Sequence, residues 1–346
     1  MGSTIIDVAK RAGASPSTVS RVLNGKGYVS PETRRRVEQA AVELGYQPNW
    51  QARALKGKPS GLVGLIIPDI SNTFYTALAQ GVTAHLRARE YEPVLCVNNE
   101  EPMVDLHYLQ ILQQKRVDGI LYAHPAGGSN RGVVEEMVRA GMPIVEINRQ
   151  HAPDLLDAAV ADTYLGAYHM TEHLLGLGHT RIGLILGESQ LITGNQRLAG
   201  YRRAHEDAHT QVDSDLICVG SFTRQHGEDA TRELLGLANR PTALFAGSNR
   251  ILVGCLAVLS ERSISIPAEL SVGSFDNAEW MGVWRPPITA VDVAIDEISR
   301  LAVDLLLRRI LQRAAGKPIT YTLSTSLIRR ASCAAPPVRT ERVPSV

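Results

Sequence analysis

Residues 6–24 read IDVAKRAGASPSTVSRVLN and predict two short helices joined by a tight turn. Thr4 and Asp7 have the spacing of a capping box, so we expect the first helix to begin at this point. Its apolar face recurs at helical spacing and ends at a glycine. Ser15 and Pro16, which follow this glycine almost at once, are residue types that begin helices. The pattern is typical of a helix-turn-helix.

A third short helix is expected from Ser30-Pro31 to Gly45, and it carries three successive arginines at 34–36. Residues 1–60 hold ten basic and four acidic side chains, whereas the remaining residues hold 26 basic and 31 acidic ones. The formal net charge of +1 therefore hides a basic head on an acidic body. This asymmetry indicates a polyanionic partner for the head, although a basic solubilising terminus would have the same charge.

The second predicted helix has an apolar stripe on one face and short polar or basic side chains on the other. The polar face carries Ser17, Thr18, Ser20 and Arg21. These residue types hydrogen-bond to base edges and phosphates in the major groove of DNA. The predicted head therefore combines the charge and the residue types of a DNA reader.

The strings IDVAKRAG at 6–13 and SPSTVSRVLN at 15–24 closely resemble the lactose-repressor (LacI-type) family of transcription regulators. The resemblance continues through VSPETR at 29–34, LGYQPN at 44–49 and ARAL at 52–55. It implies a sequence-specific DNA-binding repressor. Residues 1–47 would form the helix-turn-helix domain, and residues 48–59 would form a hinge helix and linker.

The resemblance also implies which residues contact DNA. Pro16, Ser17 and Arg21 occupy base-reading positions, but proline has no side-chain donor, so the family's operator sequences do not transfer to this chain. Leu55 occupies the position of a minor-groove wedge that kinks the duplex, unless it is a linker residue that packs on the core. Paired wedges require a homodimer on pseudo-palindromic double-stranded operator DNA. The other implied DNA contacts are Thr4, Thr18, Ser20, Asn24 and Arg53.

After Ser60 the sequence alternates between short apolar runs and helical patterns, which is typical of buried parallel strands in an α/β fold. In the first helical pattern, apolar residues recur every four positions at Phe74, Leu78, Val82 and Leu86. The predicted strands are 61–69, 93–97, 117–122 and 143–147, followed by 181–186, 216–219, 242–246 and 270–275. Two similar α/β lobes are expected.

The body is similar to the core of the same regulator family, which is of the periplasmic-binding-protein type. The resemblance implies an α/β fold class overall, with a small all-helical head and a two-lobed, doubly wound α/β core at 60–330. We expect the chain to cross between the lobes near 158–164, 276–278 and 288–292. The tail at 331–346 is rich in proline and arginine and has no leucine heptad, so we expect a dimer rather than a tetramer.

Open α/β sheets bind ligands at the carboxyl ends of their strands, so a small-molecule effector is expected between the lobes. Arg197 in NQRLAGY and Asp276 in VGSFDN match cleft motifs of the family. Phe74 or Tyr75 would stack on the ligand, unless both are core residues. The other expected effector contacts are Asn148, Asp162, Thr193, Phe222 and Ser248.

An arginine fork, a carboxylate and aromatic rings favour a sugar or sugar derivative as the effector, with nucleobases or nucleosides as the alternative. Two stretches depart from the family's pattern and leave the compound open. They are GSNR at 247–250, where relatives commonly have an Asn-Asp pair, and EINR at 146–149, where an Ile-Asp-Arg string is common. Ligand-induced rotation of the lobes is expected to act on the hinge, but its sign is open.

An enzyme is the main rival class, but the chain has no G-x-G-x-x-G, P-loop or G-x-S-x-G motif. His169, His173 and His179 could bind a metal, yet the string around them resembles an ordinary helix-to-strand turn of the family. The four cysteines are scattered without zinc-ligand or disulfide spacing. We therefore expect no catalytic activity, no metal and no cofactor.

The beginning of the sequence has no apolar signal core, and no apolar run is long enough to span a bilayer. A transport binding protein would share the two-lobed body, but it would need export and would have no DNA-reading head. We therefore expect a cytoplasmic protein without membrane contact.

Overall fold

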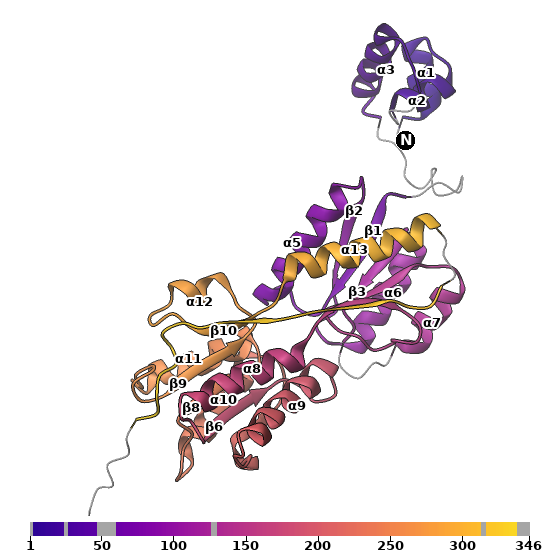
Figure 1. Ribbon diagram of the computed structural model, residues 1–346. Coiled ribbons are helices and arrows are strands. Elements are labelled where there is room, and N and C mark those ends of the chain that lie inside the picture. Colours follow the sequence, from indigo (N-terminus) through magenta and orange to yellow (C-terminus); the bar gives the residue numbers. More distant parts are fainter. Residues whose placement is uncertain (1–2, 24–26, 47–59, 126–129, 313–315, 338–346) are drawn as a thin grey trace, which may run out of the picture. The chain divides into compact units, whose positions relative to one another are not determined.

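The computed structural model describes residues 3–23, 27–46, 60–125, 130–312 and 316–337. The chain divides into two compact units, Met1–Ser60 and Gly61–Val346 (Figure 1). The predicted hinge at 48–59, with Arg53 and Leu55, lies outside the described residues, and so does Asn24.

The described residues of the head form three helices: α1 (Ile5–Ala12), α2 (Pro16–Leu23) and α3 (Pro31–Glu43). Thr4 and Asp7 form the predicted capping box, and Gly13 ends α1 in the left-handed conformation with a φ of 59°. One valine from each helix is completely buried at the centre of the head: Val8, Val19 and Val37. The predicted three-helix head is confirmed.

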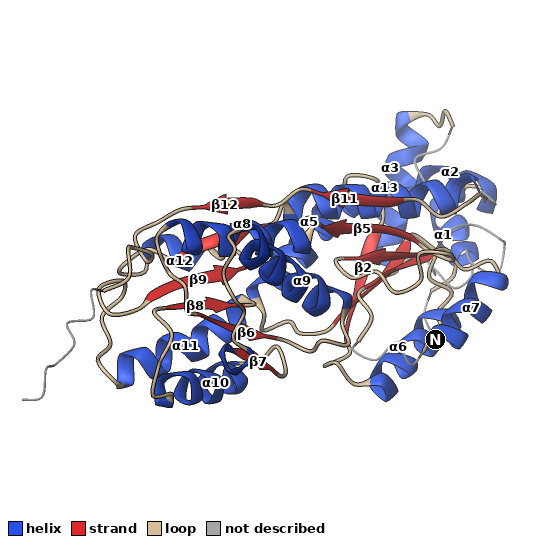
Figure 2. Cartoon of the chain, turned by 60° about the horizontal axis from the view of Figure 1, so that its bottom comes forward, coloured by secondary structure: helices blue, strands red, loops and turns tan. Residues whose placement is uncertain are grey.

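The first lobe of the larger unit, lobe one, is built on a six-stranded parallel sheet with the order β11-β5-β4-β3-β1-β2 (Figure 2). Its strands are β1 (Leu62–Ile67), β2 (Glu92–Val97), β3 (Gly119–Tyr122), β4 (Ile144–Ile147), β5 (Asp157–Ala161) and β11 (Thr320–Leu323). Its helices are α5 (Thr73–Arg87), α6 (Pro102–Gln114), α7 (Arg131–Arg139) and α13 (Ile295–Gln312).

Lobe two is built on a second six-stranded sheet with the order β12-β10-β9-β8-β6-β7, in which only β12 runs antiparallel to its neighbour. Its strands are β6 (Ile182–Leu186), β7 (Ile217–Val219), β8 (Ala243–Ala246), β9 (Ser271–Phe275), β10 (Thr289–Asp292) and β12 (Ser326–Ile328). Its helices are α8 (Thr163–Gly176), α9 (Ile192–Asp207), α10 (Arg224–Gly236), α11 (Asn249–Glu261) and α12 (Glu279–Val283).

Helices cover both faces of each sheet, which is why the central strands read as nearly continuous apolar runs. In β1, Leu65 and Ile67 belong to the core shared with α5 and α13, whereas Ile66 packs on the opposite face with α6 and α7. The predicted stripe of α5 from Phe74 to Leu86 is buried. The edge strands depart from the prediction of buried runs, and in β2 only Cys96 is buried.

The chain crosses between the lobes three times: after β5, between β10 and α13, and between β11 and β12. The expected crossing at 276–278 is wrong, because the strands on either side of it, β9 and β10, are hydrogen-bonded neighbours in lobe two. The third crossing lies instead at 324–325. It was missed because β11 and β12 are short, partly exposed strands without an apolar run.

Lobe two also extends past Arg330, where the sequence predicts a tail. The Val272 N–H donates to the Ser332 carbonyl at 2.9 Å, and His179 Nε2 lies 2.8 Å from the Ala334 carbonyl. The other ring nitrogen of His179 lies 2.9 Å from the Thr242 hydroxyl. These contacts make His179 a buried structural residue, as its resemblance to a helix-to-strand turn implies. Across the described segments, no helix is both long enough and apolar enough to cross a bilayer.

Candidate functional site

The exposed surface of α2 carries the side chains that the sequence singles out for DNA. Pro16, Ser17 and Arg21 are exposed, while Thr18 and Ser20 are half-buried. The Ser15 hydroxyl lies 2.8 Å from both the Ser17 and the Thr18 hydroxyls, so it holds the start of α2 together. Arg21 is the long basic side chain on the exposed surface of this helix.

Thr4 has a structural role at the start of α1. Its side chain donates to the Asp7 carboxylate at 2.7 Å and accepts from the Asp7 N–H at 3.3 Å. The Thr4 hydrogen bond lowers the pKa of Asp7, so this carboxylate stays charged at the positive end of the helix dipole. Thr4 is exposed at the surface of the head, although its backbone N–H donates to the Asp7 carboxylate at 2.8 Å and its carbonyl accepts from the Asp7 and Val8 N–H groups.

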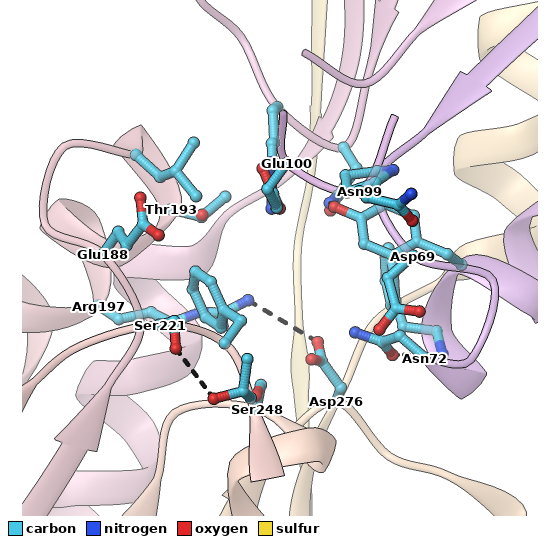
Figure 3. A pocket seen from close by; sticks show the side chains of 18 residues that line it. Asp69, Asn72, Asn99, Glu100, Glu188, Thr193, Arg197, Ser221, Ser248 and Asp276 are labelled. Atoms are coloured by element: carbon cyan, nitrogen blue, oxygen red, sulfur yellow. Dashed lines mark hydrogen bonds and ion pairs between the residues drawn. The ribbon is translucent and has the colours of Figure 1, made fainter. Parts of the chain in front are cut away.

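A cavity of about 340 Å³ lies between the two lobes, at the carboxyl ends of their strands. Figure 3 shows Thr193, Arg197 and Ser248 on the side of lobe two, and Asp69, Asn72 and Asn99 on the side of lobe one. The volume is within the range of small-molecule sites, roughly 300 to 1,000 Å³. Eight of the nine predicted effector contacts line it: Phe74, Tyr75, Asn148, Thr193, Arg197, Phe222, Ser248 and Asp276.

Asp162 is the predicted contact that the structure places elsewhere. Its carboxylate accepts a hydrogen bond from the Leu165 N–H at 2.8 Å and so caps α8, directly after the crossing from β5. Asp162 does not line the cavity. The sequence places it correctly at a crossing, but an aspartate there serves equally well as a helix cap.

Arg197 is the central cation on the wall of lobe two, and 5% of its surface is exposed. Its guanidinium donates to the Gly247 carbonyl, lies 3.7 Å from the Asp276 carboxylate and stacks 3.8 Å from the centre of the Phe275 ring. Burial lowers the pKa of Arg197 and raises that of Asp276, while their mutual attraction opposes both shifts. Within the described residues, Arg197 Nε has no hydrogen-bond partner.

Phe222 lies on the same wall, with its ring centre 5.7 Å from the Arg197 guanidinium. A Cβ atom at Gly187 would approach the Phe222 ring to 2.2 Å, so a larger residue at this strand end would displace the ring. The Ser248 hydroxyl accepts a hydrogen bond from the Ile251 N–H at 3.3 Å and caps α11, so part of its hydrogen-bonding capacity is already used.

The wall of lobe one is built around Arg149. Its guanidinium donates to both oxygens of Glu100, at 2.7 and 3.0 Å, and to the His124 carbonyl at 2.9 Å. Tyr75 accepts a hydrogen bond from the Asn148 amide at 3.1 Å, and burial raises the pKa of its phenol to about 12. The Phe74 ring packs edge to face on Tyr75, with the ring centres 5.2 Å apart. Both rings belong to the core and also line the cavity, so a core role and a ligand contact are compatible for these residues.

The two lobes also contact each other directly beside the cavity. Asn72 Oδ1 accepts from the Phe74 N–H and from the Asn249 amide of lobe two, at 3.0 Å each. Arg250 Nε lies 3.8 Å from the Asp69 carboxylate. Asn249 and Arg250 belong to the GSNR stretch, so this departure from the family's pattern supplies contacts between the lobes.

Several lining residues were not predicted as effector contacts, although all of them follow strands. They are Pro68, Asp69, Asn72, Asn99, Glu100, Glu188, Leu191, Ser221 and Thr223. Four lining residues have a positive φ: Asn99, Glu100, Asn148 and Asp276. Asn and Asp adopt this conformation more readily than most residues, so polar residues directly after a strand were the available signal.

Comparisons with known protein families give one match in each of the two units. The lacI family of bacterial regulatory proteins matches residues 4–49, and a periplasmic binding protein-like domain matches residues 171–333. The HTH-type transcriptional regulator DegA of Bacillus subtilis is 35% identical over 86% of this chain and 88% of its own length. The ribose operon repressor of Escherichia coli is 33% identical over 90% of this chain and 94% of its own.

A solved structure of the transcriptional regulator CelR in complex with cellobiose aligns with a TM-score of 0.73 at 30% identity, over 95% of this chain and 99% of that one. The fold and the cleft define a class of protein in which a DNA-reading head is joined to a ligand-binding core. The chain belongs to the LacI family of bacterial regulatory proteins. It is a DNA-binding transcription regulator and not an enzyme.

Proposed function

We propose that the chain is a repressor whose affinity for operator DNA is controlled by a sugar or sugar derivative bound between the two lobes. It acts as a homodimer on a pseudo-palindromic operator, in the cytoplasm. The observation that carries the proposal is the cavity itself. It is lined by both lobes, and it contains a buried arginine beside a carboxylate and an aromatic ring, with one donor that has no partner among the described residues.

The residues that line the cavity support a polyhydroxy ligand. Arginine and carboxylate side chains form strong, directional hydrogen bonds with hydroxyl groups, and an aromatic ring provides an apolar surface for a sugar face. Arg197, Asp276 and Phe222 would supply these three elements on lobe two, and Asn148 and Tyr75 would complete the site from lobe one. The relatives are consistent with this choice, since one is a ribose operon repressor and another was solved with cellobiose.

A ligand that contacts both lobes can bias their relative orientation, because its binding energy differs between an open and a closed cleft. We propose that this difference is transmitted to the hinge at 48–59, where Arg53 and Leu55 would contact the minor groove. A coupling of about 1–3 kcal/mol between effector and operator binding would be typical of such proteins. Operator binding measured with and without the effector determines the sign of this coupling.

On the head, we propose that Pro16, Ser17 and Arg21 face the bases, and that Thr4, Thr18, Ser20 and Asn24 face the phosphate backbone. Selection of bound duplexes from a random library by the full-length chain is expected to yield a two-fold symmetric site. Arg21→Ala should then weaken binding to that site by about 1–3 kcal/mol and relax its sequence preference.

Arg11→Ala is the matched control for the loss of one positive charge from the head, because Arg11 is on α1 and forms an ion pair with Glu43 at 2.5 Å. We expect this control to keep the sequence preference of the unmodified chain. Enrichment of no common sequence, or equal effects of the two substitutions on sequence preference, would contradict the proposed reading head.

A further inference from the structure

We propose that the effector is an uncharged polyhydroxy compound, and that Glu188 excludes sugar phosphates and sugar acids from the same cavity. This inference rests on the proposed function, because it concerns the ligand of the proposed effector site. It is drawn from the balance of charges and of hydrogen-bond donors around the cavity.

Acidic side chains outnumber basic ones on the cavity wall. The carboxylates are Asp69, Glu100, Glu188 and Asp276, and the guanidiniums are Arg149 and Arg197. Each guanidinium is already engaged by one of these carboxylates, Arg149 with Glu100 at 2.7 Å and Arg197 with Asp276 at 3.7 Å. Neither guanidinium forms an ion pair with the two remaining carboxylates, Asp69 and Glu188, although Arg149 attracts Glu188 at longer range.

Asp69 is partly compensated from outside the wall, because Arg250 Nε lies 3.8 Å away and Ser71 donates to the carboxylate through its N–H and its hydroxyl. Glu188 differs. It follows β6 and lines the cavity from lobe two, and in the described part of the chain no cation lies within ion-pair distance of it. Burial raises the pKa of Glu188 and the Glu100 carboxylate of the opposite lobe raises it further, while the attraction of Arg149 opposes both effects.

Among the described lining residues, Arg197 Nε is the buried cationic donor without a hydrogen-bond partner, whereas the Arg149 guanidinium is bonded to Glu100. The other donors of Arg197 face the Gly247 carbonyl and Asp276, and the latter already balances the positive charge. Ionised carboxylates are acceptors only, so Asp69 and Glu188 favour a ligand that brings donors to this part of the wall. Hydroxyl groups supply them, whereas a phosphate or carboxylate adds acceptors and a like charge.

The test is isothermal titration of the full-length chain with matched sets of sugars. Each set contains a free sugar, its phosphate and its acid: glucose, glucose 6-phosphate and glucuronate, the galactose and mannose equivalents, and ribose with ribose 5-phosphate. We expect one free sugar to bind, and its charged derivatives to bind on the order of 100-fold more weakly. A derivative that binds as tightly as its parent, or more tightly, would overturn the inference while leaving the sugar effector in place. No binding in any set would contradict the sugar effector itself.

Glu188→Gln isolates the residue responsible. Its side chain is half-exposed, so the substitution should leave thermal unfolding of the ligand-free chain unchanged. We expect the ratio between the affinities for the free sugar and for its phosphate to fall roughly tenfold. Glu172→Gln, an exposed glutamate on α8, removes the same charge outside the cavity and should leave the ratio unchanged. An unchanged ratio in Glu188→Gln would refute the assignment of Glu188.

Discussion

The two walls of the cleft use the same residue type in different ways. On lobe one, the Arg149 guanidinium is fixed by two bonds to Glu100 and one to the His124 carbonyl. On lobe two, the Arg197 guanidinium donates to the Gly247 carbonyl and lies 3.7 Å from the Asp276 carboxylate, and its Nε–H has no partner in the part of the chain that the structure describes. Both arginines are almost completely buried and both line the cavity.

Burial and position therefore do not by themselves identify a ligand-binding residue. A buried donor with no partner costs about 1–3 kcal/mol, and a bound ligand can recover this energy. Arg197 carries such a donor, whereas the donors of Arg149 hold the loops after β2, β3 and β4 together. We therefore interpret lobe one as the more rigid wall of the cavity, and lobe two as the wall whose arginine still has a hydrogen-bond donor for a ligand.

Removal of Arg149 should have the largest effect on stability. Arg149→Met leaves Glu100 without its guanidinium in a partly buried position, and breaking a buried ion pair typically costs about 3–5 kcal/mol. We expect about 3 kcal/mol, since the Glu100 side chain keeps 30% of its surface exposed. Urea unfolding of the ligand-free chain measures this cost.

Arg197→Met is the matched control on lobe two, where the carboxylate partner is more distant and one donor is already unused. A smaller loss of stability than in Arg149→Met is expected. An equal or larger loss would remove the distinction between the two walls.

Glu146 should give the next largest effect, as a dependence of stability on pH. Burial raises the pKa of this β4 carboxyl from 4.5 to about 7, against the hydrogen bonds that it accepts from the His151 and Ala152 N–H groups. Its folded pKa is thus above its unfolded value. Its contribution to stability is complete below pH 4.5 and is lost as the pH rises through about 7.

Glu146→Gln should therefore gain about 2 kcal/mol relative to the unmodified chain between pH 4.5 and pH 8. A comparison of the two proteins is necessary because burial lowers the pKa of His124 to about 4. This histidine acts in the opposite sense, since its contribution is lost as the pH falls from 6.5 towards 4. Glu136→Gln, an exposed glutamate on α7, is the control. Parallel pH profiles for Glu146→Gln and the unmodified chain would contradict the assignment.

The smallest effect is expected at the direct contact between the lobes. Asn249→Ala removes one buried hydrogen bond to Asn72, which keeps its bond from the Phe74 N–H. We expect a loss of about 1 kcal/mol in the free energy of unfolding, measured by urea titration. Asn195→Ala, at an exposed position on α9, is the control. A cost no larger than that of the control would mean that this contact does not help to hold the lobes.

Most of the fold could be predicted from the sequence, because central strands and the helices that cover them carry strong apolar periodicity. The stripe from Phe74 to Leu86 and the run of β1 are examples. The strands at 320–323 and 326–328 could not be predicted in the same way. They join the sheets through backbone hydrogen bonds and are partly exposed, so their side chains carry little signal.

The lining of the cavity could be anticipated where a residue matches a family motif, as Arg197 in α9 and Asp276 after β9 do. Glu188 and Asn99 follow strands without such a motif, and their place in the cavity depends on how the two lobes face each other. Asp162 is the opposite case, since it lies at the expected crossing after β5 but its carboxylate caps α8 instead of lining the cavity. Pairing between distant residues, such as that of Arg149 with Glu100, is not contained in any local pattern.

The central claim is that a ligand in the cleft controls operator binding through Arg197. The most direct test is fluorescence anisotropy of the selected operator duplex with the full-length chain, titrated with the sugar identified by calorimetry. We predict that the sugar changes operator affinity of the unmodified chain by about 1–3 kcal/mol, in either direction, and that Arg197→Met binds the operator normally but no longer responds. An unchanged operator affinity at a saturating sugar concentration, or a full response in Arg197→Met, would contradict the account.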